Sequence, residues 1–443
     1  MFTAPFPARA ARRQSRPLIG WLVAVGVLVQ LALFSYTTAS GLAGTSDSRL
    51  YLHAAQTLRA TGQLLQPDGT PYRYWPPLYP LLLAAVGSLA GVRLLHGAAL
   101  LGSLLLWSWL GRQLLPRRRA LLLPLLLALG TPGLLVGKFV WAECVFIMLV
   151  AAYLAALLQW LRTARGEWAA LATAAGVLLP LQRTLGLFLL AGVGVALLLG
   201  AWRHLAARGH WLLLLHLLLS GLSGLIWQTY ALLVVAAPSR YHPPRGWGQL
   251  LSSAADYGFV LGRWLVPLPA SARAGLPDAL WAAALLGLFA VLWPRWRSRR
   301  PVGALALPGP PSPHDAVAAN TAFPVPPGLG FGPPLMRKVL WAATVALVAL
   351  VAGLTVFAQS AAGVHDAERY ASVLYGPVVL LVLAAWPARA PRWLGAGLLG
   401  LWLLGLAFRT GHVALDLRRV PPLAAASLPG PEPHGQGIRA AEQ

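Results

Sequence analysis

The chain has 443 residues, of which 58% are hydrophobic and 11% are charged, and its mean hydropathy is +0.65. Soluble domains carry about 25% charged residues, so a chain of ordinary soluble domains is excluded. The net charge of +23 does not indicate a nucleic-acid-binding protein, because the basic residues cluster at the ends of apolar runs, where membrane topology signals lie. The sequence therefore predicts an all-α polytopic membrane protein.

Apolar runs long enough to cross about 30 Å of hydrocarbon recur along the chain and predict about 11 transmembrane helices. They form an N-terminal block over 18–293 and a C-terminal block over 339–408. The predicted spans are Leu18–Ala39, Leu94–Leu110, Leu121–Gly137, Cys144–Leu161, Trp168–Gln182, Thr184–Ala201, Trp211–Ala237, Ala279–Trp293, Val339–Ala358, Ala371–Trp386 and Trp393–Phe408.

The charges outside the spans assign each loop to a side of the cell membrane. The basic segment 1–17 is expected in the cytoplasm, and 20 of the 35 basic residues then fall inside, whereas ten of the 12 acidic residues fall outside. The Pro-rich segment 294–338 is expected to be a disordered cytoplasmic linker, and 409–443 an outer tail, also disordered. The acidic loops, and any site built from them, are predicted on the outer face.

The first outer loop, 40–93, contains two elements that are not spans. Apolar residues recur at helical spacing behind Ser46 and Asp47, which predicts an amphipathic surface helix that Gly62 ends. The run Leu78–Val92 follows a pair of prolines and is expected to be a re-entrant or interfacial helix. The tyrosines and the tryptophan between 72 and 79 are typical of a membrane interface, a reading that we favour over a sugar-binding platform.

Ionisable residues near membrane depth are costly and are therefore candidates for function. On the predicted topology several of them converge on the outer face, and these are Asp47, Lys138, Glu143, Arg183 and Arg369. A carboxylate facing two or three cations suits a reaction on a phosphate-linked lipid, in which the cations bind the phosphate and the carboxylate accepts a proton.

Each candidate also has a purely structural explanation. Asp47 and Glu143 could cap the helices that follow them, and Arg183 could reach lipid headgroups from a short hairpin. The acidic and basic residues between 365 and 369 could form a solvated loop.

Other chemistries lack support in the sequence. There is no internal repeat, no Walker loop, no Cys/His metal-binding spacing and no G-x-S-x-G motif, and the single Cys144 cannot form an intrachain disulfide. We therefore expect neither ATP-driven transport nor serine hydrolysis, and we predict no cofactor.

The order of several motifs resembles that of a known family of membrane enzymes. The motifs are Ser46-Asp47-Ser48-Arg49-Leu50-Tyr51, Asp68-Gly69, Trp75-Pro76-Pro77-Leu78-Tyr79-Pro80, Gly111-Arg112, Glu143, Gln182-Arg183-Thr184 with Gly186, and Arg369-Tyr370. Together they resemble the polyprenyl-phosphate-sugar-dependent glycosyltransferases of the GT-C fold, a superfamily that includes protein O-mannosyltransferases and lipid A aminoarabinose transferases. The resemblance covers 44–200 well and the remainder loosely.

The resemblance implies an inverting transfer of a sugar from a polyprenyl-phosphate-linked donor to a lipid, glycan or protein acceptor at the outer face. It implies that Asp47 is the general base and that Arg369, with Tyr370, lies near the donor phosphate. Glu143 and Arg183 take supporting roles, and we add Lys138 to the substrate-binding residues. Some branches carry two adjacent acids where this chain has Asp47-Ser48, so a divalent metal is compatible but unsupported.

The alternative is a polytopic lipid or glycan transporter without chemistry. Such a protein should carry polar residues midway along its helices. They are sparse here, and Gln30, Gln228 and Thr229 are among the few. The expected partners are a polyprenyl-phosphate-linked sugar, membrane lipid and an unidentified acceptor, and no nucleic acid.

Overall fold

The computed structural model describes residues 16–73, 75–200, 202, 207–234, 246–292, 333–357, 363–386 and 391–423. These residues form helices joined by short loops, and their only β-type pairings are two isolated bridges, Ala43 with Phe139 and Leu65 with Pro71. The prediction of an all-α protein is confirmed. Residues 1–15 of the basic segment 1–17, most of the Pro-rich linker and the tail from 424 lie outside the described residues.

Most predicted spans correspond to apolar helices. These helices are α2 (Arg16–Thr37), α5 (Leu89–Leu114), α6 (Arg117–Ala120), α7 (Leu123–Ala128), α8 (Thr131–Lys138), α9 (Glu143–Thr163), α10 (Gly166–Gln182), α11 (Leu185–Gly200), α12 (Ala207–Thr229), α14 (Asp278–Leu292), α17 (Pro333–Phe357), α19 (Tyr375–Ala385) and α20 (Arg392–Arg419). The region of the third span is a series of short helices, α6 to α8. Within the described ranges, seven helical stretches are long and apolar enough to cross a membrane, and two more apolar helices are shorter. The protein is a multi-pass membrane protein, and the count of eleven spans stays a prediction.

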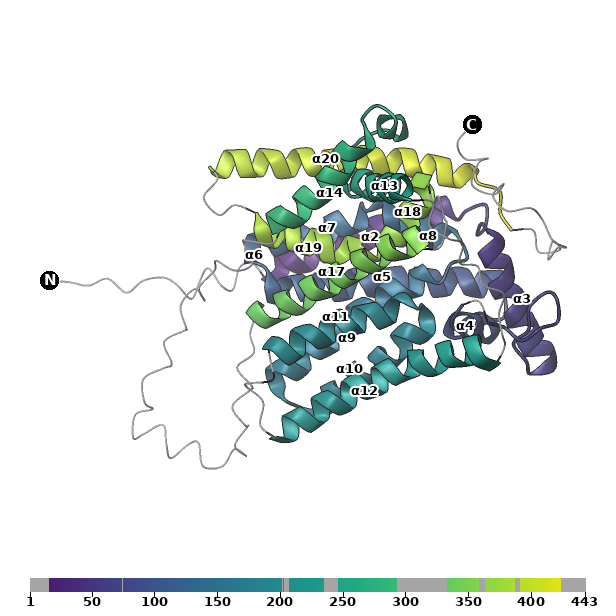
Figure 1. The fold of residues 1–443 in the computed structure, drawn as a ribbon. Coiled ribbons are helices and arrows are strands. Elements are labelled where there is room, and N and C mark those ends of the chain that lie inside the picture. The colour runs from purple at the N-terminus through teal and green to yellow at the C-terminus, as the bar shows by residue number, and fades with distance from the viewer. Residues whose placement is uncertain are drawn as a thin grey trace, which may run out of the picture.

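The long helices lie side by side in one bundle. Helix α9 packs between α5 and α10, α10 packs on α12, and α11 packs on α17 (Figure 1). The outward-facing surface is apolar, with exposed leucines such as Leu28 on α2, Leu225 on α12 and Leu404 on α20. Such a surface suits contact with lipid chains.

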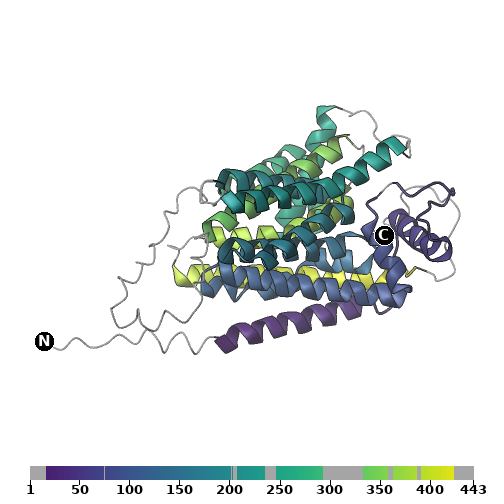
Figure 2. The ribbon, with the colours of Figure 1, turned by 90° about the horizontal axis from the view of Figure 1, so that it is seen from below.

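The two ends of the bundle differ. Helices α3 (Ser46–Thr61) and α4 (Leu78–Val86) lie together at one end, and α2 runs to that end from the other (Figures 1 and 2). Helix α5 connects α4 to the triple-arginine helix α6, which lies at the end away from α3 (Figure 1). This arrangement agrees with the expectation that the first loop and Arg117–Arg119 face opposite sides. Which end is outside remains a prediction.

The apolar run Leu78–Val92 is divided by a turn. Helix α4 has nine residues, a length of about 14 Å, which is too short to cross a membrane. Gly87 then adopts a left-handed conformation with φ 71°, and the Ser88 hydroxyl caps α5 by accepting a hydrogen bond from the Gly91 amide. The second span therefore starts at Leu89 and not at Leu94.

Three further helix boundaries differ from the sequence prediction. The third predicted span, Leu121–Gly137, is divided into α7 and α8 and preceded directly by α6, with Pro124 and Pro132 in the first turns of α7 and α8. The last six residues assigned to the linker, 333–338, already belong to α17. Helix α20 continues to Arg419, eleven residues into the predicted outer tail, because its polar residues Arg409 and Thr410 are bonded inside the protein.

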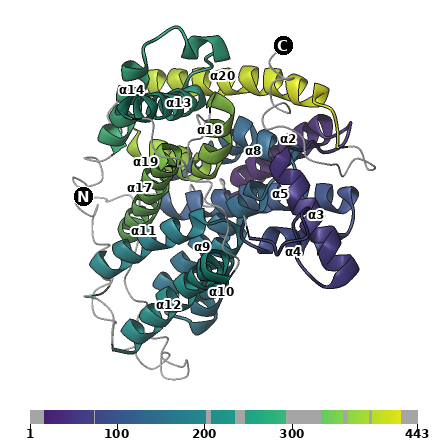
Figure 3. The same cartoon turned by 45° about the vertical axis from the view of Figure 1, so that its right-hand side comes forward.

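Helix α13 (Trp247–Leu265) was not expected from the sequence, because its apolar residues alternate with polar ones and form no continuous run. It packs against α14 and against α18 (Gly363–Ala371) and buries Tyr257, Phe259 and Trp264. Figure 3 shows α18 between α13 and α8.

The aromatic residues of the first loop are inside the protein. Tyr72 and Tyr79 are 2% and 0% exposed, and Tyr79 makes an edge-on contact with Tyr51 on α3. The Tyr79 hydroxyl shares a hydrogen bond of 2.8 Å with Nε2 of His96. For these two tyrosines the expectation of a membrane-interface belt is wrong.

Candidate active site

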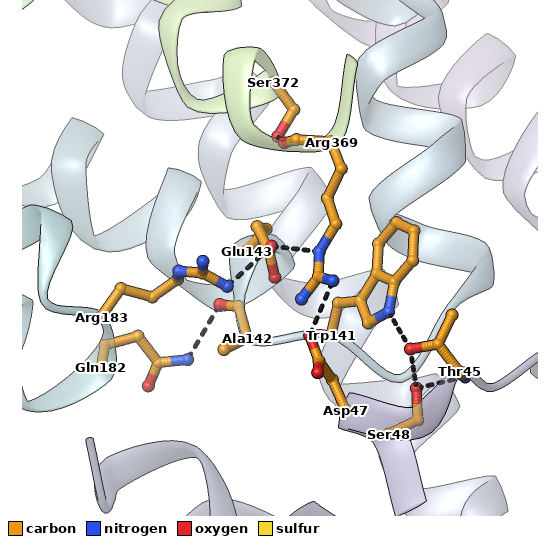
Figure 4. A network of polar contacts seen from close by, with 10 residues as sticks. All are labelled: Thr45, Asp47, Ser48, Trp141, Ala142, Glu143, Gln182, Arg183, Arg369 and Ser372. Carbon is orange, nitrogen blue, oxygen red and sulfur yellow. Dashed lines mark hydrogen bonds and ion pairs between the residues drawn. The ribbon is translucent and has the colours of Figure 1, made fainter. Parts of the chain in front are cut away.

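Four charged side chains from four parts of the chain meet at the end of the bundle that carries α3 (Figure 4). Asp47 lies in the first turn of α3, and Glu143 is the first residue of α9. Arg183 directly follows α10, and Arg369 belongs to the short helix α18. The structure thus brings together residues up to 322 positions apart in the sequence.

The four side chains form an alternating chain of acids and bases. Arg369 donates from Nη1 to Oδ2 of Asp47 at 2.7 Å and from Nε to Oε1 of Glu143 at 2.5 Å. Arg183 donates from Nη1 to the same Glu143 oxygen at 2.7 Å. The second Glu143 oxygen, Oε2, is buried and has no hydrogen-bond partner among the described residues. Glu143 is therefore the centre of the cluster.

Asp47 is not the cap of its helix. Thr45 occupies the N-cap position, and its amide donates a hydrogen bond of 3.0 Å to the Ser48 hydroxyl. The loop before Thr45 is fixed because Ala43 exchanges backbone hydrogen bonds with Lys138 and Val140. The Asp47 carboxylate is thereby turned toward Arg369, and its place in the first helical turn also favours a negative charge.

Trp141 holds Arg369 from the other side. The Arg369 guanidinium carbon lies 4.3 Å from the centre of the indole ring, a cation–π contact, and the indole N–H donates to the Thr45 hydroxyl at 2.9 Å. Tyr370 lies beside both arginines, with its ring centre 5.5 Å from the Arg369 guanidinium carbon and 5.8 Å from that of Arg183. The sequence analysis missed Trp141, and the only signal was its place two residues before Glu143.

Arg183 is directed inward by the turn between α10 and α11. It adopts an extended conformation directly after α10, and the preceding Gln182 donates from Nε2 to the Ala142 carbonyl at 3.0 Å. The end of α10 is therefore attached to the start of α9. This contact places Arg183 against Glu143, so the idea that it reaches for lipid headgroups is not supported.

Lys138 lies apart from the cluster. Its ammonium donates to the carbonyls of Thr37 and Gly41 and to the Ser40 hydroxyl, at 3.0 to 3.1 Å. An ammonium group has three donors, and these contacts use all of them. We therefore assign Lys138 the structural task of fixing the end of α2 and leave it out of the substrate-binding residues predicted from sequence.

The cluster is accessible at its edge and closed at its centre. The side chains of Asp47 and Arg183 are 16% and 12% exposed, whereas that of Glu143 is 0% exposed. Burial raises the pKa of the phenols of Tyr51 and Tyr72, which interact electrostatically with Asp47 and Arg183. Both therefore remain neutral hydroxyl groups beside the charged residues.

The arrangement leaves donors for a further anion. A guanidinium carries five N–H donors, and the ion pairs described use Nη1 of Arg183 and Nε and Nη1 of Arg369. Within the described parts of the chain, no group of three or more His, Cys, Asp or Glu residues could hold a metal ion. The prediction that no cofactor is used is left untested by this observation.

Comparisons with known proteins give a match in structure alone. No protein-family model matches the chain, and no curated protein matches it in sequence. A crystal structure of ArnT from Cupriavidus metallidurans bound to undecaprenyl phosphate superposes with a TM-score of 0.54 and 17% identity, over 93% of this chain and 67% of that one. ArnT in the apo state gives a TM-score of 0.54 and 18% identity, over 93% and 66%.

This chain therefore spans about two thirds of the length of ArnT. The similarity extends over nearly all of the present chain, and so over both the predicted N-terminal and C-terminal blocks. The chain has the GT-C-type fold of ArnT, in agreement with the resemblance found in its sequence.

Proposed function

We propose that this protein is a membrane glycosyltransferase that moves a sugar from a polyprenyl-phosphate-linked donor to an acceptor hydroxyl. The observation that carries the proposal is the convergence of a partly exposed carboxylate, Asp47, with two arginines whose ion pairs within the described parts of the chain leave further N–H donors unused. The ArnT structure with this fold is bound to undecaprenyl phosphate, which supports a lipid-linked phosphate as the ligand.

The arginines are suited to bind the donor phosphate. Arg183 and Arg369 are held 2.5 to 2.7 Å from the shared Glu143 oxygen, so their guanidinium groups are fixed before a substrate arrives. A preorganised pair of cations stabilises the negative charge that grows on a phosphate leaving group. Tyr370 borders both groups and completes this side of the proposed site.

Asp47 is suited to activate the acceptor. In the proposed step the acceptor hydroxyl oxygen bonds to the anomeric carbon of the sugar, and the bond from that carbon to the phosphate oxygen breaks. The phosphate leaves with the electron pair, and Asp47 accepts the hydroxyl proton. Attack opposite to the leaving phosphate inverts the anomeric configuration. Arg369 currently pairs with Asp47, and a bound phosphate would share this arginine.

The proposal is tested by supplying donors to the purified protein. We expect labelled sugar to move from one member of a panel of undecaprenyl-phosphate sugars to an acceptor in an envelope lipid or protein extract, with release of undecaprenyl phosphate. A transporter would instead move an intact lipid between the leaflets of a proteoliposome. Lipid movement without any cleavage of the sugar–phosphate bond would contradict the proposal.

The proposal also requires the site to face the side that presents the donor. We place it on the outer face, because most acidic residues fall there on the predicted topology. A cysteine introduced at position 68 in a Cys144→Ser background should react with an impermeant maleimide in intact cells. Labelling that needs permeabilised cells would put the site in the cytoplasm.

A further inference from the structure

We infer that Glu368, the residue next to Arg369, is a positioning residue that fixes Arg369 for phosphate binding. The inference rests on the proposed function. Neighbouring residues on a helix point about 100° apart, so Glu368 and Arg369 reach different parts of the protein from the same helix, α18. Arg369 reaches Asp47 and Glu143, whereas Glu368 reaches the helices on the other side.

The Glu368 carboxylate is held by three helices. Its Oε1 accepts from Nη2 of Arg409 on α20 at 2.5 Å and from the hydroxyl of Thr131 on α8 at 3.2 Å. Its Oε2 pairs with Nη1 of Arg263 on α13 at 3.5 Å. All four side chains are largely buried, since Glu368 is 8% exposed and Arg409 5%. Both oxygens of this carboxylate are therefore engaged by the scaffold.

The partners of Glu368 are themselves connected. Arg409 also donates from Nη1 to the Arg263 carbonyl at 2.9 Å, and Arg263 donates from Nε to the Leu268 carbonyl at 3.2 Å. Thr410, next to Arg409, donates to the Leu129 carbonyl at 2.5 Å. The carboxylate thus attaches α18 to a connected frame formed by α8, α13 and α20.

Helix α18 depends on such an attachment. It has nine residues, of which His365, Asp366, Glu368 and Arg369 are ionisable, and its buried apolar side chains among the described ones are the small Ala367 and Ala371, beside the partly buried Tyr370. Small side chains bury little apolar area, so polar contacts have a large share in the placement of this helix. A helix this short is not stable by itself. A shift of about 1 Å at a substrate-positioning group can reduce turnover about 100-fold, so the anchor of α18 bears directly on Arg369.

The test measures undecaprenyl phosphate binding in a double-mutant cycle. Glu368→Gln would leave Arg263 and Arg409 without their carboxylate, so the variant used is Glu368→Asp, which keeps the charge and shortens the side chain. Thr131→Val is a second, milder variant that removes one contact to the carboxylate. Dissociation constants are determined by titration in detergent, at a temperature where thermal melts show every variant folded.

We expect Arg369→Ala to raise the dissociation constant about tenfold or more, because charge-assisted hydrogen bonds are lost. Glu368→Asp should raise it about three- to tenfold, and Thr131→Val about twofold, in the same direction. In the Arg369→Ala background neither change should weaken binding further. Asp256 lies on α13, as Arg263 does, and forms a partly buried ion pair with Arg273, which follows that helix. Asp256→Asn breaks this pair, serves as the control and should leave binding unchanged.

The outcomes separate the two proposals. If Arg369→Ala leaves binding unchanged, the proposed function and this inference both fail. If Arg369→Ala weakens binding while Glu368→Asp does not, or if the Glu368→Asp effect persists in the Arg369→Ala background, the inference alone is overturned. If Glu368 only stabilises the fold, Glu368→Asp should lower the melting temperature, and its effect on the dissociation constant should add to the effect of Arg369→Ala.

Discussion

The two polar clusters on either side of α18 each contain two arginines that share one glutamate, but their surroundings differ. In one, two arginines share Glu143 and one of them also holds Asp47, a residue on the accessible first helix of the loop. In the other, two arginines share Glu368 and every member lies on a helix of the bundle. Asp47 is the most exposed of these side chains at 16%, and one Glu143 oxygen has no partner among the described residues, whereas both Glu368 oxygens are bonded. On the proposed function the first cluster, called open here, is the substrate site, and the second, called closed, is scaffold.

The largest effect should follow from neutralising the shared acid of the open cluster. Glu143→Gln leaves two buried guanidinium groups without their common carboxylate, and we expect it to lower the free energy of unfolding by about 3 to 5 kcal/mol. Thermal unfolding in detergent measures the loss. Undecaprenyl phosphate should then raise the melting temperature of this variant by more than that of the wild type, because an anion replaces the missing charge.

The corresponding change in the closed cluster provides the contrast. Glu368→Gln should be destabilising to a similar degree, but undecaprenyl phosphate should not stabilise it more than it stabilises the wild type. If undecaprenyl phosphate raised the melting temperatures of Glu143→Gln and Glu368→Gln equally, the distinction between a substrate site and a scaffold would be wrong.

A medium effect is expected at Lys138. Lys138→Met leaves the Thr37 and Gly41 carbonyls and the Ser40 hydroxyl without their donor, which should cost about 1 to 3 kcal/mol of stability. Sugar transfer per folded molecule should stay within about twofold of the wild type. A large rise in the donor KM with unchanged stability would instead restore the sequence-based expectation that Lys138 binds the donor phosphate.

The smallest effect is expected at Trp141. Trp141→Phe keeps an aromatic face against Arg369 and removes the indole N–H that donates to Thr45. The free energy of unfolding should fall by about 1 kcal/mol or less, since one neutral hydrogen bond is removed. Thermal melts of this variant and of Trp141→Leu separate the hydrogen bond from the cation–π contact, and Trp141→Leu should be the less stable of the two.

Much of the fold could be predicted from the sequence, because a membrane span is a local pattern of about 20 apolar residues. The same locality explains the errors. Helix α13 has no continuous apolar run, and which of its side chains are buried is set by its packing against α14 and α18, which the sequence does not show. The end of α20 was placed too early because the apolar run stops at the charged Arg409, whose partner Glu368 lies 41 positions away.

The candidate site shows the same limit. Asp47, Glu143, Arg183, Arg369 and Tyr370 were identified from their ionisable character and their order in the motifs, and the structure brings all five together. Lys138 was also chosen for its ionisable character. No pattern in the sequence shows that its ammonium donates to three nearby oxygens. Trp141 and Glu368 act through tertiary contacts, which a single sequence does not display.

The most direct test of the proposed mechanism compares two acids of the same loop. Asp47→Asn removes the proposed base while keeping its size. Asp68→Asn is the matched control, because Asp68 is exposed and accepts hydrogen bonds from Thr70 that an Asn oxygen can also accept. Sugar transfer is measured for both variants at equal amounts of folded protein. We expect Asp47→Asn to reduce the rate about 100- to 10,000-fold and Asp68→Asn to leave it nearly unchanged. An Asp47→Asn variant that keeps more than about a tenth of the rate would contradict the general-base role.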